Sequence, residues 1–488
     1  MVRRVLVLML IAKVAFAQAP SDDGSAEGLL RNGFVSFNSG DYERSAAIFS
    51  DFMESYGSAS EAQQYFERVQ RMLSFSYLKL KDYDSAQDPV KVYLETFPDG
   101  EAVEELSFWQ CVLSLKSNDI DTALAQIDAF IQKYPKNDNL PELRLMQLIA
   151  NIGEQKYDEV LKLYPIAEPT LNGSIRYQAM TLALFAEIQS QLYDEALVRV
   201  KVFPVTADDL DQISGFHLLA LDLGSRLLEE GRHRDALVSL QRAWSRNRIL
   251  SRQAVRLEQL EEDLATAEKA RVPDELEVLR LKDVIARVNK ELSQLESMEL
   301  YDTALQFRIA ECFFQLKRLR ESFLVIRGML NELPDSELLI HGNYRMLLCL
   351  TQMERWEEAI ESAVNFEERF PDSKLRPNVI YLMGESEMRR KDFQSAAAVF
   401  ARLVSSYPDF QEVERCHFLH GYCLMMTEAH TDAVEVFDQF LSQRGQSDFK
   451  SEVTYWKAMA FHYLKEWEQS REAHGLYLDT YPDGKYRT

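Results

Sequence analysis

A repeat of 37 residues constrains the fold of this chain more than any other feature of the sequence. Each copy carries a small or compact residue at a fixed place, which we use as its reference position. Successive reference positions are 41, 37, 37, 36, 40, 86, 37, 37, 37 and 37 residues apart, and four equal intervals in a row are difficult to obtain by chance. The eleven reference residues are Ser45, Ala86, Ala123, Val160, Ala196, Ala236, Ser322, Ala359, Ala396, Ala433 and Ser470.

The residue types at other fixed places of the repeat predict a pair of packed helices. Twelve residues before the reference position, eight of the eleven copies carry a small residue, which close contact between two helices requires. The reference residue and the apolar residues four and seven places later fall on one stripe of a helix. A proline twelve places after the reference residue ends the second helix in six copies. These prolines are Pro98, Pro135, Pro334, Pro371, Pro408 and Pro482.

In these features the chain resembles the tetratricopeptide repeat family, over about 400 residues, although that family usually repeats every 34 residues. Segments such as YLMGESEMRRKDFQSAAAVFARLVSSYPDF resemble exported bacterial members, such as the Tol–Pal coordinating protein and outer-membrane assembly lipoproteins. The predicted fold class is therefore all-α, a tetratricopeptide-like α-solenoid of about eleven helix-turn-helix repeats. Two prolines, Pro165 and Pro169, should shorten the second helix of the fourth repeat, and Pro89 should kink that of the second.

The 86-residue interval contains one period plus an insertion of roughly 49 residues. Apolar residues alternate there by three and four on both sides of Arg271-Val272-Pro273-Asp274, which supplies a helix stop and a helix start. The pattern predicts an antiparallel coiled-coil hairpin at 249–299, between solenoid segments at 28–248 and 300–488. Two interpretations remain open, since the hairpin either projects to dock a partner or lies across the solenoid as a spacer.

The first residues have the features of an export signal. Arg3 and Arg4 precede a short apolar run, and Ala15-Phe16-Ala17 forms a small-x-small cleavage site. We expect a signal peptide at 1–17, a linker at 18–27, and a periplasmic or secreted protein without a membrane-spanning segment after cleavage. The five cysteines are odd in number and widely spaced, which does not indicate a disulfide framework.

Charge and motifs disfavour several classes of function. The formal net charge of −23 repels phosphate backbones, so we expect no nucleic-acid partner. No catalytic or nucleotide-binding motif is recognisable, so we expect no enzyme activity, catalytic residue or cofactor. Cys416, His420 and Cys423 lie at i, i+4 and i+7, which suits a metal. Apolar or small residues dominate the same positions in other repeats, which favours packing and predicts no metal site.

Aromatic residues recur fifteen places before the reference position. The resemblance implies that first helices line a concave groove, where these side chains would touch a bound protein segment; the alternative is that they pack between successive first helices. The predicted function is a scaffold for protein partners in the cell envelope. Two alternatives are a structural protein that self-associates through its coiled coil or uncapped C-terminal end, and a non-catalytic part of a longer enzyme. The candidate binding residues are Phe108, Phe307, Tyr344, Tyr381, Phe418 and Tyr455.

Overall fold

The structure is a computed structural model that describes residues 25–57, 59–205, 212–269, 275–332, 338–444 and 446–486. The predicted signal peptide at 1–17 and most of the predicted linker lie outside these residues. Within the described segments every regular element is a helix, so the predicted all-α class is confirmed. No helix of this described part combines the length and the apolar character needed to cross a bilayer.

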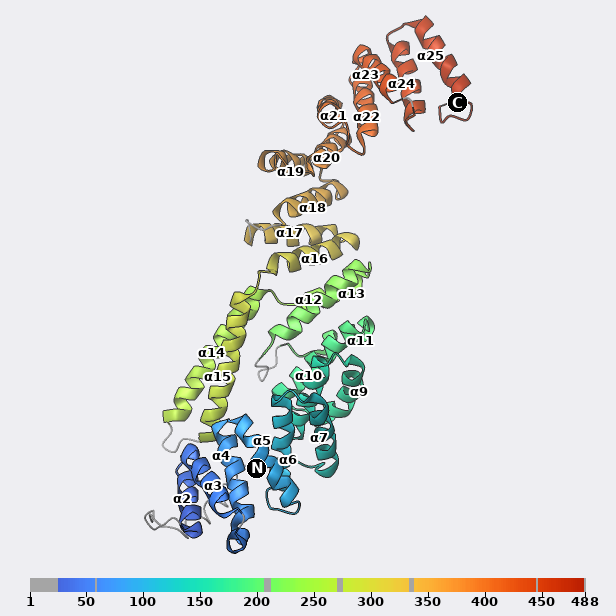
Figure 1. Cartoon of the computed structure of the whole chain (residues 1–488). Helices are drawn as coiled ribbons and strands as arrows, with labels where there is room; N and C mark the ends of the chain where they lie inside the picture. Colours follow the sequence, from blue (N-terminus) through green and yellow to red (C-terminus); the bar gives the residue numbers. More distant parts are fainter. Residues whose placement is uncertain are drawn as a thin grey trace. The chain divides into compact units, whose positions relative to one another are not determined.

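The chain divides into two compact units, Met1–Gly215 and Phe216–Thr488. The helices of the first unit, most of them labelled in Figure 1, are α2 (Ala26–Asn38), α3 (Tyr42–Tyr56), the 3-10 helix η1 (Ser60–Tyr65), α4 (Phe66–Leu80), α5 (Tyr83–Thr96), α6 (Val103–Lys116), α7 (Ile120–Lys133), α8 (Leu140–Gly153), α9 (Tyr157–Ala167), the 3-10 helix η2 (Glu168–Thr170), α10 (Gly173–Gln189) and α11 (Tyr193–Val202).

Helix α12 (Ser214–Glu229) begins at the boundary, and all further helices belong to the second unit. These are α13 (His233–Arg242), α14 (Arg246–Lys269), α15 (Glu275–Ser297), α16 (Asp302–Gln315), α17 (Leu319–Glu332), α18 (Leu339–Gln352), α19 (Trp356–Arg369), α20 (Arg376–Arg389), α21 (Phe393–Ser406), α22 (Val413–Met426), α23 (His430–Gln443), α24 (Lys450–Tyr463) and α25 (Trp467–Thr480).

Small residues in first helices allow the two helices of a repeat to approach closely. Gly421 of α22 lies against Phe437 of α23, and a Cβ atom at Gly421 would lie 2.3 Å from Cε1 of that ring. One repeat earlier, a Cβ atom at Gly384 would lie 2.7 Å from Cε1 of Phe400. Glycine therefore provides the space into which the residue four places after the reference position packs.

A residue in the left-handed backbone region joins the two helices of every repeat. The position five places before the reference residue has a positive φ in all eleven copies, as Gly40, Gly231 and nine non-glycine residues. At Lys391 the φ is 66°, and two backbone hydrogen bonds close the turn, from Lys391 N to Met388 O and from Asp392 N to Glu387 O. This pattern of bonds is a Schellman motif, which satisfies carbonyl groups at the end of the first helix.

The insertion forms two long helices, α14 and α15, which pack on each other through an apolar cluster of Leu260, Leu281, Val284 and Val288. Helix α13 packs directly on α16, so the stack of repeats continues across the insertion (Figure 1). The supercoiling implied by a coiled coil stays a prediction.

The prolines have unequal effects on the helices that contain them. Helix α9 has 11 residues, against 14 in most second helices, and a 3-10 turn with Pro169 follows it. Pro165 lies inside its last turn, so the predicted shortening occurs. Helix α5, in contrast, continues through Pro89 from Tyr83 to Thr96, and the side chain of Gln70 donates a hydrogen bond to Pro89 O at 3.0 Å.

Candidate protein-binding site

The six predicted binding residues all lie on first helices of repeats, and each side chain is half-buried. Five of them belong to the second unit: Phe307 on α16, Tyr344 on α18, Tyr381 on α20, Phe418 on α22 and Tyr455 on α24. Phe108, on α6, belongs to the first unit. The second unit therefore holds five of these aromatic residues on successive first helices, and we call these five the aromatic column.

Tyr381 makes the most extensive polar contacts in the aromatic column. Its hydroxyl donates to Glu385 Oε1 at 2.6 Å, and Arg415 of the next first helix donates to the same oxygen at 2.9 Å. The Arg415 guanidinium also lies 5.6 Å from the centre of the Tyr381 ring. Burial, together with Glu385, raises the pKa of Tyr381, so the hydroxyl stays a hydrogen-bond donor at neutral pH.

The last two residues of the column stack on other aromatic rings. Phe418 lies 5.7 Å from the ring of Phe449, which directly precedes α24, at an interplanar angle of 17°. Tyr455 stacks on Tyr486 at 4.1 Å and 7° and meets Tyr477 edge-on at 5.8 Å. One side of each ring is therefore occupied by its own solenoid.

The other candidates also pack against their own repeats. Phe307 contacts the apolar cluster around Ile326, and Tyr344 the cluster around Phe366. Burial raises the pKa of Tyr344. Phe108 meets Phe130 of α7 at 6.4 Å. Both interpretations of these residues stay open, because a half-buried ring packs on one side and offers the other to a ligand.

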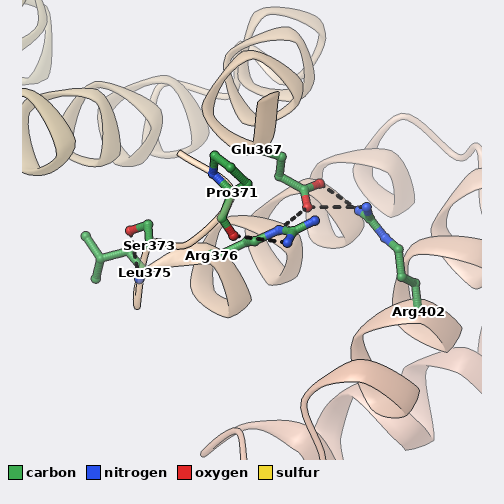
Figure 2. A network of polar contacts seen from close by, with 6 residues as sticks. All are labelled: Glu367, Pro371, Ser373, Leu375, Arg376 and Arg402. Atoms are coloured by element: carbon green, nitrogen blue, oxygen red, sulfur yellow. Dashed lines mark hydrogen bonds and ion pairs between the residues drawn. The ribbon is translucent and has the colours of Figure 1, made fainter. Parts of the chain in front are cut away.

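A largely buried carboxylate joins α20, the helix that carries Tyr381, to its two neighbouring helices. Glu367 of α19 accepts hydrogen bonds from Arg376 Nε at 3.0 Å and from Arg402 Nη2 at 2.7 Å, and its side chain is only 10% exposed (Figure 2). Arg376 also donates to Pro371 O at 3.1 Å, which fixes the loop between the two repeats. These contacts tie α20, which carries Tyr381, to α19 and α21.

The sequence contains one indication of this network, an acidic residue at a position where the neighbouring repeats are apolar. The repeat pattern alone does not predict its partners. Glu367 occupies the position eight places after the reference residue, where the neighbouring repeats carry Leu330, Val404 and Leu441. An acid at a position that is apolar in the neighbouring repeats requires a charged or hydrogen-bonding partner if it is buried. Which arginines supply it depends on the packing of successive repeats.

The candidate metal ligands of α22 lie in an apolar environment. Cys416 and Cys423 belong to one cluster with Ala396, Phe400 and Leu403. Burial raises the pKa of both thiols to about 12 and lowers the pKa of the His420 imidazole, so each residue prefers its neutral form. Within the described segments no three His, Cys, Asp or Glu residues lie close enough together to hold a metal ion.

Fold and repeat pattern together define a tetratricopeptide-type α-solenoid. Residues 381–449, which include Tyr381 and Phe418, match the family model described as tetratricopeptide repeat. No curated protein matches the chain.

The chain is also similar in fold to several solved structures. The protein YrrB, described as "a TPR protein with an unusual peptide-binding site", is 15% identical, with 40% of this chain and 92% of that chain covered at a TM-score of 0.32. MamA from Desulfovibrio magneticus RS-1 is 14% identical, with 48% and 97% covered at a TM-score of 0.31. The TPR domain of P58(IPK) is 11% identical, with 90% and 98% covered at a TM-score of 0.22.

Proposed function

We propose that this chain is an exported, non-catalytic scaffold that binds protein partners of the cell envelope along the aromatic column of its second unit. The observation that supports the proposal is the overlap of the tetratricopeptide match, at 381–449, with the residues Tyr381 and Phe418. Repeats of this kind stack into an extended surface that binds other proteins. The Glu367 network stabilises the orientation of α20 in the middle of that surface.

Cross-linking in the native host tests the column directly. A photoactivatable side chain placed at position 345 or 382, next to a column residue, should capture the same partner, and one placed on the exposed second-helix position 398 should not. Changing Tyr344 and Tyr381 to Ala should abolish the cross-link while circular dichroism stays unchanged. An unchanged cross-link in the double variant would remove the column from the binding site.

Export is tested by a separate experiment, because it is proposed from the predicted signal peptide at 1–17 and not from the repeats. A reporter enzyme that is active only outside the cytoplasm, fused after residue 40, should be active. Changing Leu6, Leu8 and Ile11 to charged residues should keep it inactive, since a charged segment no longer has the apolar run of a signal peptide. Activity that survives this change would contradict export through this segment.

A second candidate function is self-assembly, which the surface of α25 favours. Trp467 is 58% exposed, Leu476 60% and Leu478 48%, which is unusual for large apolar side chains of one helix. Light scattering should then report a mass that rises with concentration, and Leu476→Glu should keep the chain monomeric. A constant monomer mass for the unaltered chain would exclude this function.

A further inference from the structure

The turn between α6 and α7 and the end of α8 line an open hollow on the surface of the first unit. Its volume is about 330 Å³, and its apolar walls are Leu115, Ile120, Met146 and Ile149. Ile149 is 50% exposed there. An apolar cavity of about 150 Å³ already holds a benzene molecule, so this hollow has room for a large aromatic side chain.

A single glycine keeps the hollow open. Gly153, the last residue of α8, lines it, and a Cβ atom built on Gly153 meets no other atom within 4 Å. Gly153 occupies the position seven places before the reference residue. The other ten repeats carry a side chain of four or more non-hydrogen atoms at this position, among them Lys116, Gln189 and Gln352. The fourth repeat alone therefore lacks the side chain that would cover the space beside Ile149.

The rim of the hollow is acidic, and the next residues of the chain line a second, polar hollow. Glu154 is exposed at the rim and forms no ion pair within the described part of the chain. This second hollow, of about 530 Å³, is lined by Gln155 to Glu159, and so includes the carboxylates of Asp158 and Glu159. Lys156 also lines this second hollow, but its ammonium group pairs with Asp121 at 3.3 Å, and Lys162 pairs with Glu159 at 2.7 Å. Two lysines against the four carboxylates of Asp121, Glu154, Asp158 and Glu159 leave a net negative charge next to an apolar hollow.

We infer that these two hollows bind an extended segment of a partner protein in which a large aromatic residue is followed by lysine or arginine. The aromatic side chain fills the space over Gly153, and the basic side chain lies beside Glu154 and Asp158. The site differs from the aromatic column, since it lies in the first unit at the turn between the helices of a repeat. It rests on the proposed function only in that the ligand is a protein segment.

The probe for this site is a synthetic nine-residue peptide, blocked at both ends, with tryptophan followed by two lysines in a glycine–serine segment. In methyl nuclear magnetic resonance spectra of the full chain, the probe should shift the methyl signals of Ile120, Met146 and Ile149 in a saturable manner. Replacing its tryptophan by alanine, or its lysines by glutamate, should weaken binding at least tenfold. The absence of shifts at these methyl groups, or equal affinity for the three peptides, would overturn the inference.

Gly153→Gln separates binding from folding, because it introduces the residue that other repeats carry into free space. It should weaken probe binding at least tenfold without changing the circular dichroism spectrum. Gly475→Gln is the matched control, since Gly475 also has no atom within 4 Å of an added Cβ, and it should bind the probe normally. Unchanged binding in Gly153→Gln would exclude the hollow. The Tyr344 and Tyr381 double variant should bind the probe normally, so failure of the column and failure of this site are distinguishable.

Discussion

The carboxylate of Asp302 accepts hydrogen bonds from the backbone N–H groups of Arg246 and Asn247, which lie 56 and 55 residues earlier in the chain. Asp302 begins α16, and Arg246 begins α14. The side chain of Arg246 in turn donates to Leu295 O at 2.6 Å and to Glu296 O at 2.7 Å, at the end of α15. The start of α14 and the end of α15, which form the base of the inserted helical pair, are therefore fixed to each other and to the repeat that follows.

Replacing Asp302 should loosen the base of this pair. Asp302 is buried, so Asp302→Ala leaves two backbone N–H groups without their acceptor, and we expect a loss of about 2 kcal/mol in the free energy of unfolding. Asp302→Asn retains one acceptor oxygen and should lose less. Urea denaturation measures the loss, and hydrogen exchange of residues 246–250 locates it. Equal stability of the three proteins would show that the cap contributes nothing.

Two glycines, one packed against a ring and one facing free space, predict opposite effects of substitution on stability. Gly421→Val places new atoms against the Phe437 ring and should destabilise the chain by about 1–3 kcal/mol, as overpacking does. Gly475→Ala adds a methyl group in free space within a helix and should stabilise it by about 0.5–1 kcal/mol. Thermal and urea denaturation test both changes, and a tolerated valine at 421 would contradict the close packing of α22 and α23.

The turn residues predict stabilisation by glycine. Lys391 adopts a φ of 66°, which costs a residue with a side chain roughly 1 kcal/mol relative to glycine. Lys391→Gly should therefore raise the free energy of unfolding by about 0.5–1 kcal/mol. Lys374→Gly, in a loop residue outside the set with positive φ, serves as the control and should not be stabilising. A destabilised Lys391→Gly variant would mean that the lysine side chain contributes more than the backbone strain costs.

The sequence predicts the helix pairs because their packing is local. Gly421 and Phe437 are 16 residues apart, so a pattern within one repeat contains both sides of the contact. The turn is less visible, because nine of eleven left-handed residues are not glycine and lack its sequence signal. The hydrogen bonds of the Schellman motif compensate for the strain at those residues.

The repeat pattern does not predict contacts between residues that lie far apart in the sequence. Helix α14 begins at Arg246, three residues before the predicted hairpin, because Asp302 caps it from the far side of the insertion. The hollow in the fourth repeat likewise depends on how α8 packs beside the turn at Asn118. Gly153 was visible as an exception in the repeat, but only the packing shows that its missing side chain leaves an open space.

Two buried histidines predict a loss of stability in weak acid. Burial lowers the pKa of His217 to about 3 and that of His417 to about 4, from an ordinary value of about 6.5. Between pH 6.5 and about 4, the unfolded chain therefore binds a proton at each site that the folded chain does not bind. The free energy of unfolding should fall as the pH falls, by about 2 kcal/mol for each histidine between pH 7 and pH 5.

Phenylalanine substitutions test this dependence separately from stability itself. The ring of His217 stacks on Trp244 at 4.6 Å, and His217→Phe retains a ring there but loses the contact of Nδ1 with Arg242 O at 3.0 Å. The variant should be less stable at pH 7. Between pH 7 and pH 5, however, its free energy of unfolding should fall by about 2 kcal/mol less than that of the unaltered chain, because one histidine no longer takes up a proton on unfolding. In a double variant that also carries His417→Phe, this fall should be smaller by about another 2 kcal/mol. Because carboxylates titrate mainly below pH 5, a slope that both variants leave unchanged would show that these histidines are protonated in the folded chain.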